Sequence, residues 1–180
     1  MSRTTPAMLR DVLGLTFEPV QVVAMVAFGC VLAAGVLMAC ALDGLAGWRL
    51  ALGAVLLADI GAGCLSNFTA STNQYYAQRP ALRWAFIALH VHLLVVAWAL
   101  QWPMLPALLA WGWTVGTAAL VNLLAGNASQ RLVAGGLFAL SLLAPLAWAV
   151  PVPMQVVTAL FTLKVAYAFA VRHEPVRAAA

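Results

Sequence analysis

The chain has 180 residues, of which 65% are hydrophobic and 8% are charged, and its formal net charge is +4. Soluble domains carry about 25% charged residues, so this composition excludes a water-exposed surface and predicts a protein surrounded by lipid. In lipid, backbone polar groups must bond within the chain, which leaves helices or a closed barrel. The apolar runs are continuous and of membrane-spanning helix length. We therefore expect one all-α, polytopic membrane domain over residues 1–180.

Residues 1–18 predict a short interfacial helix on the cytoplasmic side, before the first span. Thr5 can cap this helix, and Pro6 suits its first turn. One side of the helix would be apolar and contact lipid, whereas Arg10, Asp11 and Glu18 would face water. The segment is therefore expected to lie along the membrane surface.

Six transmembrane helices are predicted in residues 19–171. Their approximate ranges are 19–42, 49–66, 84–102, 105–125, 132–150 and 152–171. Turn-forming residues separate them, at Asp43-Gly44, Pro103 and Pro106, Gly126-Asn127, and Pro151 and Pro153. Residues 172–180 would form a cytoplasmic tail.

Arginines predict the orientation of the six spans. Arg49 alone falls on one side of the predicted bundle, and the opposite side carries Arg3, Arg10, Arg79, Arg83, Arg131, Arg172 and Arg177. Cytoplasmic loops carry an excess of basic residues, so both termini are expected in the cytoplasm, at a bacterial inner membrane. Because topology accounts for the positive charge, we expect no nucleic-acid partner.

Four ionisable residues lie inside predicted spans at a common depth. Counted from the cytoplasmic helix ends, Asp59, His90, His92 and Lys164 all lie about 9–12 Å into the membrane. Such residues are energetically unfavourable in lipid and mark functional sites. We expect Asp59, His90 and Lys164 to converge as a proton-handling set among the second, third and sixth spans. The alternative is structural, with Asp59 only neutralising Lys164.

The two histidines are expected to play different roles. On a regular helix, His90 and His92 point about 200° apart. We therefore predict that His90 faces Asp59, and that His92, a secondary candidate, faces another helix or a carbonyl group. The same geometry argues against one metal held by both rings, and neither a metal nor a cofactor is expected.

The segment from residue 66 to residue 78 is the most polar in the chain, yet it contains no acid and no base. Its amides and hydroxyls, followed by two arginines, suit a cavity mouth that binds a polar solute or an anionic head group. The predicted binding residues are Asn67, Asn73, Tyr75, Tyr76, Arg79 and Arg83, with Asn122 and Tyr167 as secondary candidates. The alternative is a plain interfacial loop.

Three functions fit these residues. The first is proton-linked transport of a small polar or anionic solute, in which breaking the Asp59 pair couples binding to a conformational change. The second is a membrane-embedded enzyme for a lipid or isoprenoid substrate at the cytoplasmic leaflet, with His90 as general base. The third is a structural or assembly subunit.

The expected partners are membrane lipids and the solute. Gly112 and Gly116 form a small-xxx-small pair in the fourth predicted span. Such pairs let helices approach closely, either within this fold or between copies in a homo-oligomer.

Overall fold

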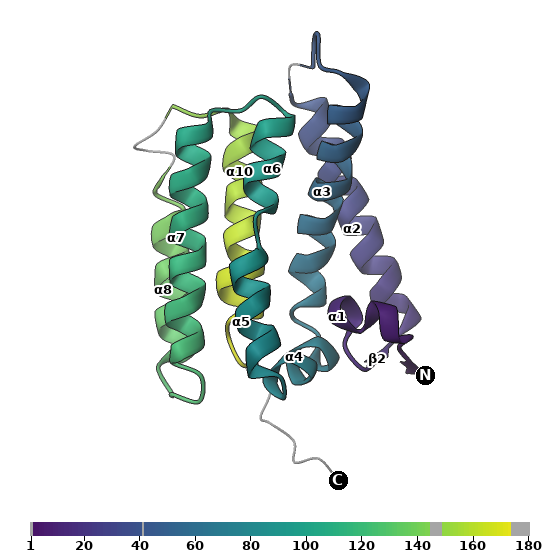
Figure 1. The fold of residues 1–180 in the computed structure, drawn as a ribbon, viewed down its shortest axis with the longest axis vertical. Helices are drawn as coiled ribbons and strands as arrows, with labels where there is room; N and C mark the ends of the chain where they lie inside the picture. Colours follow the sequence, from purple (N-terminus) through teal and green to yellow (C-terminus); the bar gives the residue numbers. More distant parts are fainter. Residues whose placement is uncertain (1, 41, 145–148, 174–180) are drawn as a thin grey trace.

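The computed structural model describes residues 2–40, 42–144 and 149–173, and most of them are helical (Figure 1). Five helical segments in this part of the chain are long and apolar enough to cross a membrane: Pro19–Met38 (α2), Gly47–Ser66 (α3), Pro80–Ala99, Met104–Leu123 (α7) and Val152–Phe169. The prediction of a helical protein with helices long and apolar enough to span a membrane is therefore confirmed, whereas the six spans and the positions of the termini stay predictions. Most of the predicted tail, from residue 174 onward, lies outside the described residues.

The predicted fifth span differs from a regular membrane helix. Helix α8 covers Gln130–Ser141, only twelve residues, and residues 142–143 form a turn. A proline lacks the N–H that bonds the carbonyl four residues earlier, and Pro145 stands four residues after Ser141. The described part of the predicted helix 132–150 is thus interrupted, and residues 145–148 lie outside the described chain.

The third and sixth predicted spans each contain an irregular segment. The third is divided into Pro80–Leu89 (α5) and His92–Ala99 (α6). The sixth begins as the α-helix Val152–Thr162 (α10) and continues as a π-helix, Leu163–Phe169 (η2). A π-helix is rare and occurs frequently at functional sites, so both irregularities bear on the candidate site.

Two glycines bring the first two long helices together. A Cβ atom added to Gly61 of α3 would lie 2.9 Å from the Gly29 Cα atom of α2. Packing of small residues drives such close approaches in membranes. Gly112 and Gly116, by contrast, have no atom within 4 Å of an added Cβ. Within the described part of the chain they do not pack helices against each other, and packing between copies stays a prediction.

Both ends of the described chain lie at one end of the bundle, where helix Ala70–Ala77 (α4) runs across it (Figure 1). We call this the α4 end. Helix α8 begins at this end, and Arg131 is its second residue. Arg49 lies near the start of α3, at the opposite end of the bundle. The described arginines therefore follow the asymmetry that the sequence predicts.

The N-terminal segment is not the simple helix that was predicted. Strand Arg3–Thr4 (β1) pairs with strand Thr16–Phe17 (β2), and the 3₁₀ turn Ala7–Leu9 (η1) and helix Arg10–Leu13 (α1) lie between them. Thr5 does not cap a helix. Its backbone N–H instead donates to the Leu15 carbonyl, which closes the two-stranded pair.

Candidate functional site

An ion pair joins α3 and η2 within the membrane-spanning segments. The Lys164 Nζ atom lies 2.6 Å from Asp59 Oδ2 and also donates to the Asp59 carbonyl at 3.3 Å. The Lys164 side chain is 4% exposed, whereas the Asp59 side chain is 45% exposed. The sequence argument from equal depth therefore placed the acid and the amine correctly. We call Asp59, Lys164 and the neighbouring His92 the Asp59 centre.

Gly63 makes room for the lysine. A Cβ atom added at Gly63 would collide with the Lys164 Cε and Nζ atoms. Gly63 lies one turn after Asp59 on the same side of α3, so the lysine side chain runs along the helix at the position where a side chain is missing. Cys64 is adjacent, and its thiol donates to the Leu160 carbonyl at 3.1 Å.

The histidine beside Asp59 is His92, so the expectation that His90 would be its partner is wrong. The His92 Nε2 atom lies 3.9 Å from Asp59 Oδ2. The expectation assumed a regular helix through both residues. In the structure the ψ angle of His90 is 73°, whereas a helix has about −42°. The two histidines therefore do not have the angular separation that a regular helix would give them.

His90 instead stabilises the break between α5 and α6. Its Nδ1 atom lies 2.6 Å from the Phe86 carbonyl, which the break deprives of its usual helical donor. Trp111 of α7 donates to the His90 carbonyl at 2.8 Å. The other ring nitrogen, His90 Nε2, is buried without a partner in the described structure, and so is His92 Nδ1. An unsatisfied buried polar group costs about 1–3 kcal/mol.

Two of the residues predicted to form a cavity mouth instead donate hydrogen bonds to backbone carbonyls of the last helix and of the residues just after it. Asn67 donates to the Lys164 carbonyl at 3.2 Å, and Asn73 donates to the Val171 carbonyl at 3.1 Å. Val171 lies just beyond the end of η2, where helix carbonyls lack intrahelical donors, and the Asn73 amide supplies one. The Lys164 carbonyl, which accepts from Asn67, lies near the start of η2. Both amides are buried, so neither presents its side chain to a solute in this conformation.

Arg83 also binds carbonyl groups at the end of the last helix, and its side chain makes three hydrogen bonds in total. Its Nη2 atom donates to the carbonyls of Phe169 (2.8 Å) and Ala170 (2.7 Å), and its Nε atom donates to Asn122 Oδ1 (2.6 Å). The residue is 2% exposed. An anionic head group therefore does not meet this guanidinium group at the surface, and Asn122 acts as its partner within the protein.

Gln130, which the sequence analysis missed, completes this arrangement. Its Nε2 atom donates to the carbonyls of Val121 and Ala170, and its Oε1 atom accepts from the Arg172 backbone N–H. The sequence signal that could have identified Gln130 is an amide side chain at the start of an apolar helix. The acceptors on α7 and beyond η2 could not be identified from sequence.

The tyrosines of α4 hold the N-terminal segment. Tyr75 donates to the Asp11 carboxylate at 2.8 Å, and Tyr76 donates to the Asp11 carbonyl at 2.9 Å. Arg79 donates to the Tyr75 carbonyl and lies over its ring at 4.1 Å. Tyr167 of η2 packs its ring near Phe68. The N-terminal segment thus covers the predicted mouth.

Docking of the N-terminal segment is expected to weaken at high pH. The hydrogen bond to the Asp11 carboxylate raises the pKa of Tyr75 above its usual value. Because the pKa is higher in the folded state, the bond stabilises the fold below the usual pKa of about 10 and is lost as pH rises through the folded pKa. In detergent, Tyr75→Phe should unfold about 1 kcal/mol more easily than wild type at pH 8. This difference should shrink as the pH rises through the raised pKa of Tyr75, and a difference that stays constant with pH would contradict the assignment.

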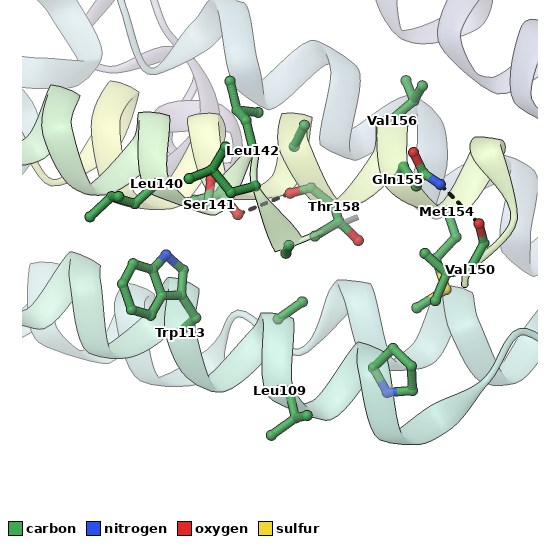
Figure 2. Close-up of a pocket in the computed structure, with 16 residues that line it drawn as sticks. Leu109, Trp113, Leu140, Ser141, Leu142, Val150, Met154, Gln155, Val156 and Thr158 are labelled. Carbon is green, nitrogen blue, oxygen red and sulfur yellow. Dashed lines mark hydrogen bonds between the residues drawn. The ribbon is translucent and has the colours of Figure 1, made fainter. Parts of the chain in front are cut away.

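An apolar cavity lies apart from the Asp59 centre. It has a volume of about 590 Å³ and lies between α7, α10 and the end of α8 (Figure 2). Figure 2 shows Leu109, Trp113 and Met154 around the cavity. Gln155, which also lines the cavity, donates its side-chain amide to the Val150 carbonyl. Its walls carry no charged side chain among the described residues. This cavity suits hydrocarbon rather than the chemistry of a proton-handling site.

Among residues 2–40, 42–144 and 149–173, no group of three histidine, cysteine or acidic side chains could hold a metal ion. The five apolar helices and the internal ion pair define the class: a helical membrane-embedded protein. Beyond this class, the chain matches no protein-family model, no curated protein and no solved structure.

Proposed function

We propose that the chain is a multi-pass protein of a bacterial inner membrane that transports a small polar solute in a proton-linked manner. Its α4 end, with both termini, would face the cytoplasm, in keeping with the arginine asymmetry. The observation that carries the proposal is the half-exposed carboxylate of Asp59, paired inside the membrane with the nearly buried Lys164.

The ion pair provides a means of coupling. A proton or a solute that takes the Asp59 carboxylate releases Lys164 from its 2.6 Å contact. Lys164 belongs to the π-helix η2, so its release changes the contacts of the last helix with α3. The ionisable groups that face Asp59 are Lys164 from η2, His92 and His90 from the third span, and Cys64 from α3.

The irregular helices favour movement at this level. The break between α5 and α6 and the start of η2 both adjoin the Asp59 centre. Transporter binding sites are typically formed by discontinuous helices near the midplane, where backbone geometry can change. This arrangement favours transport over a rigid assembly role, in which the irregular segments would serve no purpose.

The geometry favours a neutral or cationic solute over an anionic one. The two arginines expected to hold an anion, Arg79 and Arg83, already donate to protein oxygens. The accessible charge at the Asp59 centre is instead a carboxylate. We therefore propose a solute with hydrogen-bond donors.

The glycine beside Lys164 gives a specific test. We expect Gly63→Ala to displace the lysine and to reduce proton-linked transport at least ten-fold, because the added methyl group occupies the lysine path. Gly116→Ala is the matched control, since a methyl group there meets nothing within 4 Å. The measurement is the pH change inside proteoliposomes that contain pyranine, after a pH gradient is imposed and a panel of small amines, amides and amino acids is added.

Both glycine variants should elute as folded protein in detergent with unchanged helical circular dichroism. Equal transport by the two variants would rule out a role for the Asp59–Lys164 contact. Absence of any solute-dependent pH change in wild type would overturn the proposed function.

A further inference from the structure

The Asp59 centre is rich in hydrogen-bond acceptors. Besides the Asp59 carboxylate, it contains the buried His92 Nδ1 atom and, on the adjacent ring, His90 Nε2, both without partners in the described structure. The His90 Nδ1 atom donates to the Phe86 carbonyl, which leaves Nε2 with its lone pair. The centres of the two rings are 5.2 Å apart. The described chain supplies one strong donor here, Lys164.

The carboxylate is reachable from the lipid side of α3. Asp59 follows Ala51 and Val55 at four-residue spacing, so the three residues share one side of the helix. Ala51 is exposed and Val55 is 66% exposed. An apolar surface therefore leads to the half-exposed Asp59 side chain, whereas Lys164 approaches it from the protein interior.

From this juxtaposition of an acceptor-rich centre and an apolar approach, we infer that the Asp59 centre binds a protonated amine with an apolar substituent. This inference rests on the proposed function, because it names the class of solute. The ammonium group donates to the half-exposed Asp59 carboxylate, while the apolar substituent remains along Val55 and the surrounding lipid.

The same site explains how the proton is linked. One carboxylate neutralises one cation in a low-dielectric environment, so the bound ammonium group and protonated Lys164 compete for Asp59. When the amine binds, Lys164 becomes a neutral amine and its proton passes to water. When the proton returns to Lys164, the ion pair at 2.6 Å reforms and the ligand leaves. The exchange conserves charge at the centre.

The test uses three matched probes and the full chain in detergent, with equilibrium binding measured by calorimetry. Benzylammonium carries charge and N–H donors, benzyltrimethylammonium carries charge without donors, and benzoate is an anion. We expect benzylammonium to bind at least ten-fold more tightly than benzyltrimethylammonium, and benzoate not to bind. Binding of benzyltrimethylammonium or benzoate as tight as that of benzylammonium, or no binding of benzylammonium, would overturn the inference.

Two variants and one control variant locate the site. Asp59→Asn should weaken benzylammonium binding at least ten-fold, whereas Asp43→Asn, at an exposed acid in the loop before α3, should leave it unchanged. Lys164→Met should tighten benzylammonium binding about ten-fold, because the competing ammonium group of the lysine is removed. This variant tests the site even if Asp59→Asn fails to fold. Equal effects of the two acid-to-amide changes, or weaker binding by Lys164→Met, would contradict the site.

The outcomes separate the inference from the proposed function. If benzylammonium binds but moves no protons in proteoliposomes, the site stands and the transport proposal fails. If a neutral solute drives proton movement that Gly63→Ala abolishes while benzylammonium does not bind, transport stands and the amine inference fails.

Discussion

Replacing Asp59 by asparagine is expected to abolish proton-linked transport and to lower the free energy of unfolding by about 3 kcal/mol. The change leaves Lys164, whose side chain is 4% exposed, without a counter-charge, and removing one partner of a buried pair costs about 3–5 kcal/mol. We take the low end because the Asp59 side chain is 45% exposed. Transport is measured in proteoliposomes and stability by denaturant unfolding in mixed micelles.

The partner substitution and the double variant make this prediction sharper. Lys164→Met should also destabilise the fold, because it leaves the Asp59 carboxylate in the membrane without a counter-charge. The double variant Asp59→Asn/Lys164→Met should recover stability to within about 1 kcal/mol of wild type, since no unpaired charge remains. It should not recover transport. Restored transport would assign the pair a structural role only.

Replacing Arg83 by methionine is expected to destabilise the fold by about 2–4 kcal/mol without a comparable direct effect on amine binding. The guanidinium group makes two hydrogen bonds to carbonyls at the end of the last helix and one to the Asn122 side chain of α7. Each oxygen left unsatisfied costs about 1–3 kcal/mol. Relief from burying the charge offsets part of this loss, and the Gln130 amide still satisfies the Ala170 carbonyl.

The matched control is Arg79→Met. Arg79 lies nearby in the chain and makes one hydrogen bond, to the Tyr75 carbonyl, so its replacement should cost no more than about 1 kcal/mol. Unfolding in mixed micelles measures both variants, and hydrogen exchange of amides 165–171 should increase only for Arg83→Met. An equal loss of stability in the two variants would contradict the bracing role of Arg83.

The general architecture and the acid–amine pair were predictable from sequence. Composition requires helices in lipid, and counting residues from the helix ends places Asp59 and Lys164 at one depth. Depth can be counted in this way because the rise per residue is nearly constant along a helix, however the helices pack against one another.

The choice between the two histidines was not predictable by the same means. Rotation about a helix accumulates residue by residue, so one irregular ψ angle changes which residues share a face. Neither proline nor glycine marks the break at His90, and no sequence signal announces the π-helix that contains Lys164. The amides and the arginine around α4 were recognised as unusual, but their acceptors are backbone carbonyls of the last helix, whose positions only the packed structure defines.

The separation between the two partners of the ion pair has a consequence for biogenesis. Lys164 is synthesised 105 residues after Asp59, which at typical translation rates is an interval of about 5–20 s. During this interval α3 must enter the bilayer with its acid unmatched, while α2 is already available to pack beside it. Closure of the pair therefore marks the arrival of the final helix, and truncated chains that lack it would display an orphan carboxylate to the quality-control proteases of the membrane.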